Sequence, residues 1–215
     1  FIFYAKIAHI LPGLLGGLSY SWPRVWAYMY LYDTGIFGIV LELGATIILG
    51  FILFGSFLQE AGAGKFFTDL GFLLVGRLRG GPAKVTLITT GLLGMITGSP
   101  LANAGTIGPM TIPLMAKSGY KPEYSAGVLA LGATGATLVP PVMGAVAFIM
   151  AHYSGNTYGR ICLAAILPSI LYYGSIYFQI DFKVLREKTG YAFSKEEIPS
   201  LGKVMSEGWL HLIPM

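Results

Sequence analysis

The residues best suited to chemistry lie in one short polar stretch, Ile96 to Gly105, with the sequence ITGSPLANAG. This stretch holds a hydroxyl at Ser99 and an amide at Asn103, together with a proline and two glycines. Two apolar runs, 85–96 and 107–116, flank it. Neutral oxygens of this kind suit a sodium ion, and the amide N–H groups suit a carboxylate. The stretch is therefore a candidate site for an ion or a small anion.

The apolar runs on either side indicate the kind of structure that contains this stretch. Each run is shorter than the about 20 residues that a helix needs to cross a bilayer. Glycine, proline and serine favour a turn between them. The pattern predicts a helical hairpin at 83–116 that enters a membrane and turns back. Backbone at such a depth must be buried in protein or line a wet cavity, which is where transport sites form.

A second interruption, GATGATLVPP at 132–141, divides the apolar segment 123–151. Its two prolines lack N–H donors, so we expect unpaired carbonyls near Ala136 and Thr137. Its two glycines lower the cost of unwinding the helix. The segment is therefore predicted to be a broken helix.

A hairpin tip beside a broken helix favours an ion-coupled transport site. Freed carbonyls and helix C-termini attract a cation, whereas helix N-termini attract an anion. The side-chain oxygens available for sodium are those of Ser99, Asn103 and either Thr134 or Thr137. Either interruption alone would more simply be a packing or kinking feature, because Gly and Pro are common in membrane helices. The two together favour transport.

The composition identifies a membrane protein. Hydrophobic residues make up 54% of the chain and charged residues only 11%, with a mean hydropathy of +0.68, whereas soluble domains contain about 25% charged residues. The single cysteine, Cys162, excludes an intramolecular disulfide and a cysteine-cluster metal site. No basic run is dense enough to indicate nucleic-acid binding.

The chain is predicted to be an all-α membrane protein with transmembrane helices, a re-entrant helical hairpin and a broken helix. Residues 1–58 are expected to form scaffold helices, with the end of an apolar helix at 1–18, an interfacial aromatic loop at 19–34 and a span at 35–58. The parts expected after them are an amphipathic arm helix (59–82), a transport part (83–151), a spanning helix (161–180), a charged cytoplasmic linker (181–207) and the start of a further repeat (208–215). Phe1 begins inside an apolar run, so we expect a segment of a larger protein.

The basic residues predict the orientation. Eleven of the 14 Lys and Arg residues fall within 65–84, 117–121 and 183–203. Loops rich in Lys and Arg stay on the cytoplasmic side. The hairpin is therefore expected to open toward the cytoplasm, with its tip near the middle of the membrane.

Other chemistries fit less well. Ser99 and His152 suggest an intramembrane serine hydrolase, but Pro100 follows the serine and His152 is expected at the outer surface. Glu42 lies inside the span 35–58, where a carboxylate is a functional candidate, but it is near the start of that helix.

The order of the motifs resembles a known family. TGSPLAN at 97–103, PLM at 113–115, GY at 119–120 and PPVMGA at 140–145 are similar to the large membrane subunit of tripartite ATP-independent periplasmic (TRAP) transporters. GRLRGGPAK at 76–84 and the run 140–151 resemble the fused permeases that work with TAXI-type binding proteins. SPLAN stands where the family often has SAVAN.

The resemblance implies an elevator-type secondary transporter of the cell inner membrane, a multi-pass protein built from two inverted repeats. It implies sodium coupling, an organic acid substrate, an extracytoplasmic solute-binding protein of TAXI type, and a small membrane subunit or its fused equivalent. The chain would hold the first repeat, and the second repeat would be missing. Another secondary transporter, or a channel with re-entrant loops, is the alternative.

The resemblance also assigns residues to two sites. The sodium ligands would come from the hairpin tip and the broken helix, namely Ser99, Asn103, Gly135, Thr137, Leu138 and Pro140. The substrate would be bound by Gly98, Ser99, Asn103 and Thr134.

Overall fold

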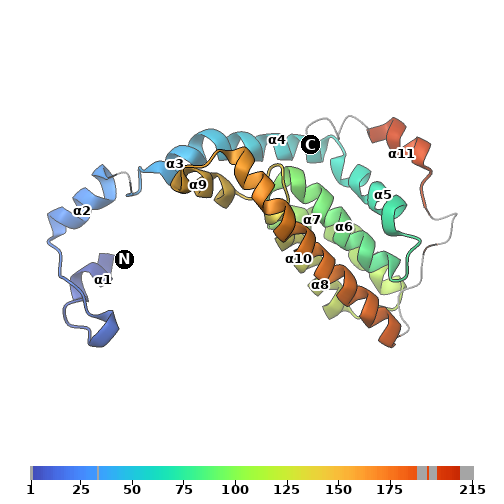
Figure 1. Cartoon of the computed structure of the whole chain (residues 1–215), viewed down its shortest axis with the longest axis horizontal. Coiled ribbons are helices and arrows are strands. Elements are labelled where there is room, and N and C mark those ends of the chain that lie inside the picture. Colours follow the sequence, from blue (N-terminus) through green and yellow to red (C-terminus); the bar gives the residue numbers. More distant parts are fainter. Residues whose placement is uncertain (1, 33, 188–192, 194–197, 209–215) are drawn as a thin grey trace. The chain divides into compact units, whose positions relative to one another are not determined.

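The structure is a computed structural model that describes residues 2–32, 34–187, 193 and 198–208. Every regular element within these residues is a helix, which confirms the predicted all-α class. The chain forms two units, 1–49 and 50–215, of which the second contains the predicted hairpin and broken helix (Figure 1).

The first unit contains short helices. Helix α1 covers Ile2–Ile7, a 3-10 turn covers Gly13–Leu15, and α2 covers Trp22–Leu31. The apolar stretch 1–18 is helical only over α1 and the 3-10 turn, because Pro12 and a left-handed Gly13 (φ 66°) interrupt the backbone. The aromatic region forms a surface helix, in which Trp22 and Trp26 are exposed.

Two helices among the described residues are long and apolar enough to cross a membrane. The first covers 22 residues, Ile39–Glu60, and consists of α3 (Ile39–Leu43), a π-helical turn (Gly44–Ile48) and α4 (Leu49–Glu60). The second is α10, which covers 30 residues, Tyr158–Glu187. Glu42 is exposed in the first turn of the first of these helices.

The predicted arm helix at 59–82 is shorter than expected. Helix α4 ends at Glu60, and α5 covers only Ala63–Val75. The Gly80-Gly81-Pro82 segment opens the next helix instead of closing the arm, since proline in a first helical turn removes an N–H that has no partner there anyway. Helix α5 buries Phe66 and Phe67, so it packs against the bundle as well as presenting a polar face.

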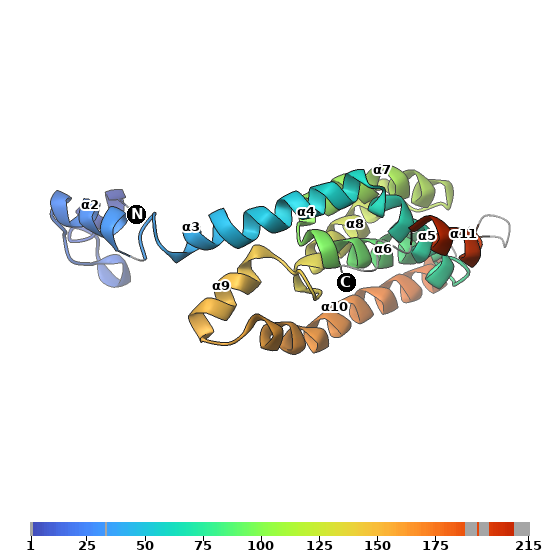
Figure 2. The ribbon, with the colours of Figure 1, turned by 90° about the horizontal axis from the view of Figure 1, so that it is seen from above.

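The hairpin consists of α6 (Gly81–Thr97) and α7 (Pro100–Lys117), and α8 (Pro122–Gly135) packs on both arms (Figure 2). Gly132 was predicted to ease unwinding, but it lies within α8. A side chain at Gly132 would collide with the Thr90 hydroxyl of α6. Gly135 likewise faces the Tyr172 ring. These glycines therefore allow close helix packing, as small residues do in membrane bundles.

The helix break lies slightly later than predicted. A 3-10 turn at Ala136–Leu138 follows α8, the chain is then irregular to Gly144, and α9 covers Ala145–Ser154. The two prolines of the break cannot donate to a helix, which keeps this stretch irregular. Figures 1 and 2 show α10 running back along the bundle after α9.

Helix α10 extends beyond the predicted span 161–180 and into the expected charged linker, ending at Glu187. The extension buries Val184 against the bundle, and Asp181 and Lys183 both have ionic partners within it. Helix α11 covers Leu201–Gly208. Apart from Gly208, the expected start of a further repeat lies outside the described residues.

Candidate ion and substrate site

The hairpin tip is a two-residue connection between antiparallel helices. Helix α6 ends at Thr97, and Gly98 then adopts a left-handed conformation with φ 57°. Ser99 is the N-cap of α7, and its Oγ accepts a hydrogen bond from the Ala102 N–H at 3.4 Å. Pro100 follows in the first turn, where its fixed φ suits a helix start. The sequence of the tip therefore encodes a helix end and a helix start without a linker.

Two buried oxygen atoms near the tip have no hydrogen-bond partner among the described residues. Asn103 is fully buried, and its Nδ2 donates to the Thr90 carbonyl at 2.6 Å, whereas its Oδ1 is unpaired. The Thr97 Oγ1 is the second such atom. Burying an unpaired polar atom costs about 1–3 kcal/mol. Both atoms are of the type that ligates an alkali cation.

Thr97 is a candidate ligand that the sequence reasoning missed. Its hydroxyl belongs to the same TGS motif as Ser99, and it occupies the last position of α6, so the motif itself contained the signal. A threonine in a membrane helix usually bonds to a carbonyl one turn earlier, as Thr106 and Thr111 do. Thr97 lacks such a bond among the described contacts.

The broken helix folds over the tip. The Val142 N–H donates to the Met95 carbonyl, in the last turn of α6, at 3.1 Å. A side chain at Gly98 would collide with the Met143 carbonyl oxygen, and a Cβ at Gly144 would lie 3.6 Å from the Gly98 carbonyl oxygen. The absence of a side chain at Gly98 therefore lets the hairpin tip touch the break.

The start of the break also lies against the hairpin. A Cβ at Gly94 would lie 2.8 Å from the Ala136 Cα and 3.2 Å from the Asn103 Nδ2, so these two residues share the surface of α6 at Gly94. The Gly144 N–H donates to the Thr137 carbonyl at 3.1 Å. Asn103, Ala136 and Thr137 are thereby brought close to the tip.

The predicted residues thus divide into two groups. Gly98 of the hairpin touches the break at Met143, and Asn103 lies against the same position of α6 as Ala136 at the start of the break. Thr137 is joined to this junction through Gly144, whereas the described contacts do not connect Ser99, Leu138 or Pro140 across it. Gly135 and Thr134 behave differently. Gly135 faces α10 and Thr134 is exposed, with its hydroxyl donating to the Ala130 carbonyl of its own helix at 2.8 Å. The described contacts do not bring Thr134 to the tip.

The carbonyls expected to be free near Ala136 and Thr137 have donors in the structure. The Ala136 carbonyl accepts from the Val139 N–H at 3.3 Å, and the Thr137 carbonyl accepts from Gly144. The first donor comes from the 3-10 turn before the prolines, and the second comes from the chain after them, which turns back toward Thr137. A carbonyl oxygen has two lone pairs, so either group retains capacity for a cation.

Four helix ends converge where the tip meets the break. Helices α6 and α8 present their C-termini, and α7 and α9 present their N-termini. The first pair carries partial negative charge and the second partial positive charge. Within the described part of the chain, no three His, Cys, Asp or Glu side chains are grouped to hold a metal. The site therefore offers neutral oxygens and helix dipoles, which fit sodium and a carboxylate rather than a transition metal.

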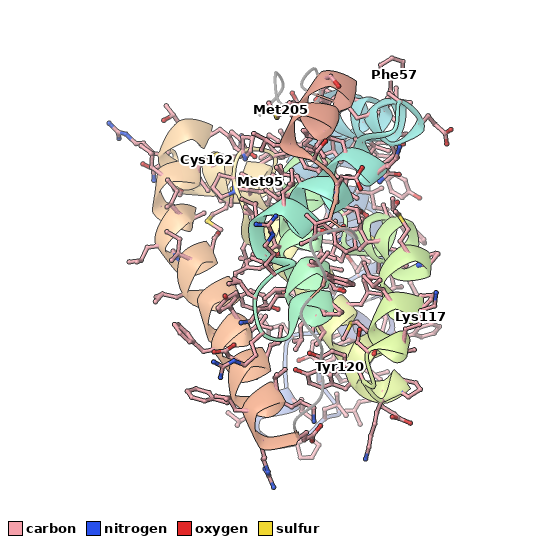
Figure 3. All side chains as sticks on the ribbon, turned by 90° about the vertical axis from the view of Figure 1, so that its right-hand side faces the viewer. Phe57, Met95, Lys117, Tyr120, Cys162 and Met205 are labelled. Carbon is pink, nitrogen blue, oxygen red and sulfur yellow. The ribbon has the colours of Figure 1, made fainter. Side chains whose placement is uncertain are left out.

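The opposite end of the bundle has a different chemistry. The Lys84 side chain of α6 is only 3% exposed and lies 2.5 Å from the Asp181 carboxylate of α10, with its Nζ 4.1 Å from the centre of the Tyr177 ring. In Figure 3, Met95 and Cys162 lie toward the tip, whereas Lys117 and Tyr120 lie toward this other end. The sequence reasoning treated Lys84 as a loop charge, because no sequence pattern connects residues so far apart.

The fold is that of an all-α membrane protein, and the candidate binding groups lie where its helices are interrupted. The family model described as "Tripartite ATP-independent periplasmic transporter, DctM component" matches residues 2–215. The chain therefore belongs to the TRAP transporter DctM family. This is a family of transporter components and not of enzymes, so the hydrolase alternative with Ser99 and His152 is not supported.

Curated relatives carry the same description. The chain is 26% identical over 173 residues to the 2,3-diketo-L-gulonate TRAP transporter large permease protein YiaN of Escherichia coli, covering 74% of this chain and 40% of the relative. It is 27% identical over 160 residues to the C4-dicarboxylate TRAP transporter large permease protein DctM of Pseudomonas aeruginosa, covering 74% and 35%. It is 29% identical over 121 residues to the isethionate TRAP transporter permease protein DctMQ of Oleidesulfovibrio alaskensis, covering 56% and 19%. The chain spans less than half the length of these relatives.

Proposed function

We propose that this chain forms part of the permease of a secondary active transporter, which imports an organic acid anion together with sodium across the cell inner membrane. The observation that carries the proposal is the meeting of the hairpin tip with the broken helix, where four helix ends converge around the unpaired Asn103 and Thr97 oxygens. The names of the three relatives above refer to a keto acid, C4-dicarboxylates and a sulfonate, all of which are organic anions.

The sodium ligands would be neutral oxygens. The candidates are the Asn103 Oδ1, the Thr97 and Ser99 hydroxyls, and carbonyls of the break between Gly135 and Pro140. A bound sodium ion would supply positive charge next to the C-termini of α6 and α8, where the dipoles favour it. The cation would also satisfy the buried Asn103 oxygen, which supports a site there.

The anion would be bound by the positive helix ends. The N-terminus of α7 begins at Ser99 and presents backbone N–H groups at the tip, as anion sites at helix N-termini do. Gly98, Asn103 and Thr134 are the other substrate candidates. The Asn103 Nδ2 is already bonded to the Thr90 carbonyl. Asn103 would therefore act mainly as a sodium ligand through its Oδ1, and it would contribute less to substrate binding.

The remaining parts of the transporter would lie outside this chain. They comprise a second inverted repeat with its own hairpin, a small membrane subunit or its fused equivalent, and an extracytoplasmic solute-binding protein of TAXI type. In the elevator mechanism that we propose, the hairpin and α8 would move as one body against scaffold helices. The extensive packing of α8 on both α6 and α7 supports such a common movement.

The proposal is tested by uptake into proteoliposomes that contain the full-length protein and its binding protein, with and without an inward sodium gradient. Loss of one ligand from a buried site should reduce sodium-dependent uptake by about tenfold in Asn103→Ala, and less in Ser99→Ala, whose oxygen is half-buried. Matched controls are Asn156→Ala and Ser154→Ala, which remove the same groups from an exposed turn and should transport normally.

Two results would contradict the proposal. Uptake that does not depend on the sodium gradient, and that neither site substitution changes, would mean that the hairpin tip and the broken helix are packing features only. Flux of the anion without any binding protein would instead favour a channel with re-entrant loops. Replacing the sodium gradient by a proton gradient in the same vesicles separates the two coupling ions.

A further inference from the structure

A row of hydroxyl groups on α10 faces the broken helix. The row lies on one side of α10 and is formed by Tyr158, Ser169, Tyr172 and Tyr173. Each of these hydroxyls reaches a backbone carbonyl in the last turn of α8 or in the break. The spacing of 158, 169 and 173 by 11 and then four residues keeps these positions on the same face of a helix.

The two tyrosines of the row hold the end of α8. The Tyr172 hydroxyl donates to the Leu131 carbonyl at 2.9 Å, and the Tyr173 hydroxyl donates to the Gly132 carbonyl at 2.7 Å. Carbonyls in the last turn of a helix lack part of their normal i+4 pairing. Gly132 is one of the last four residues of α8, so Tyr173 acts as a side-chain cap from a neighbouring helix, whereas Tyr172 adds a donor to a carbonyl one residue earlier.

The other two hydroxyls hold the break itself. The Ser169 Oγ lies 2.7 Å from the Leu138 carbonyl and 2.7 Å from the Ala165 carbonyl of its own helix, so it shares one proton between them. The Tyr158 hydroxyl lies 2.8 Å from the Pro141 carbonyl and within hydrogen-bond distance of the Val142 carbonyl. The Tyr158 ring stacks on Phe148 of α9, which fixes its direction.

Val142 is the point at which α10 and the hairpin meet. Its N–H donates to the Met95 carbonyl of α6, and its own carbonyl accepts from Tyr158. The break is thus bonded to two neighbours. The N–H of Val142 connects it to the hairpin, and the carbonyl of Val142 connects it to α10. Any displacement of Tyr158 would be transmitted directly to the backbone that covers Gly98.

We propose that Tyr158 and Tyr173 are positioning residues for the ion site, which act by fixing the backbone at the end of α8 and at the end of the break, on either side of the carbonyls proposed to bind sodium. This inference rests on the proposed function. The row uses neutral donors, so it orients the backbone without placing a fixed charge beside a cation. These residues hold the backbone on either side of the candidate ligand carbonyls at 135–140 and do not bind the ion themselves.

The test measures sodium dependence in proteoliposomes of the full-length protein with its binding protein, for Tyr158→Phe and Tyr173→Phe. Both substitutions keep the ring and remove only the hydroxyl. Tyr177→Phe is the matched control, because Tyr177 lies on the same helix but its ring packs on Lys84 at the other end of the bundle. The sodium concentration for half-maximal uptake should rise about three- to tenfold in the two site variants. The maximal rate at saturating sodium should stay close to wild type, and the control should be unchanged.

Cys162 provides a second readout without transport, because its half-buried thiol lies 3.5 Å from the Pro141 carbonyl. Its maleimide labelling, located by peptide mass spectrometry, should be slowed by sodium in the wild type. Tyr158→Phe should need a correspondingly higher sodium concentration for the same protection.

The inference is overturned if both variants keep the wild-type sodium dependence, or if their maximal rate falls while the half-maximal concentration stays the same. The second result would mean a purely structural role for the hydroxyls. In both of these cases the wild type still responds to sodium, so the proposed function stands. If wild-type uptake and Cys162 labelling are both indifferent to sodium, the proposed function fails and this inference fails with it.

Discussion

The two ends of the helical bundle are held together by different chemistry, although the same helix, α10, contributes to both. At the tip end, hydroxyl groups of α10 donate to backbone carbonyls of the break and of the last turn of α8. At the other end, Asp181 of α10 forms an ion pair with the buried Lys84 of α6. The first end contains irregular backbone, and the second contains regular helices packed around Ile176, Ile180 and Val184.

This difference follows from what each end must do. A fixed charge in a low-dielectric interior acts strongly on any ion nearby. Neutral hydroxyls at the tip end satisfy carbonyls of the broken backbone and add no fixed charge beside the proposed ion site. At the other end no ion site is proposed, so a charged pair can fix the start of the hairpin against α10. Three predictions test the comparison, and they are ordered by expected size.

The largest effect is expected for Gly98→Ala at the tip. A left-handed backbone is unfavourable for alanine, and the new Cβ would collide with the Met143 carbonyl. Together these should destabilise the hairpin against the break by about 2–5 kcal/mol. The thermal midpoint of the full-length protein in detergent should fall, and uptake should be lost.

Gly105→Ala is the control for this change. A Cβ at Gly105 meets no described atom within 4 Å, and the residue lies in the middle of α7. Alanine there should be neutral or stabilise the helix by up to about 1 kcal/mol. Equal behaviour of the two variants would mean that the tip and the break do not touch.

A smaller effect is expected for Lys84→Met at the other end. Asp181 would lose its partner, but its side chain is 36% exposed and can recruit water. The cost should therefore lie below the 3–5 kcal/mol of a fully buried pair, at about 1–3 kcal/mol. Thermal unfolding measures the loss, and sodium affinity should stay unchanged because the pair lies away from the tip.

The double variant Lys84→Met with Asp181→Leu sharpens this prediction. Replacing both members of a buried pair by apolar groups is often neutral, and methionine can keep contact with the Tyr177 ring. Stability should return to near the wild-type value. A double variant as unstable as the single one would show that the pair itself, and not an unpaired Asp181, controls the packing.

The smallest effect is expected for Lys183→Met. Lys183 pairs with Glu187 one turn along α10 at 2.7 Å, and both side chains lie largely at the surface. Exposed pairs of this type contribute little to stability. The thermal midpoint should not move measurably. If the thermal midpoint fell as much as in Lys84→Met, the stabilising effect of the ion pairs at this end would depend on their charge and not on their burial.

Much of the fold was predictable from local patterns. The apolar runs and the Gly-Ser-Pro tip predicted the α6–α7 hairpin within two residues at either end, since a helix stop and a helix start are encoded locally. The same reasoning misread Gly80-Gly81-Pro82, because glycine and proline can close one helix or open the next. In the structure, Gly80 is left-handed and is the N-cap of α6, and Pro82 lies in the first turn of that helix, so the segment opens α6.

The sequence by itself determined the membrane class, the hairpin and the existence of a break, because composition, spacing and residue type carry that information. Tertiary structure alone decided which carbonyls of the break acquire donors, that Gly132 and Gly135 serve packing, and that Lys84 pairs with Asp181. It also revealed Thr97 as a ligand candidate and the hydroxyl row of α10. These depend on contacts between residues far apart in the chain, and no local periodicity records such contacts.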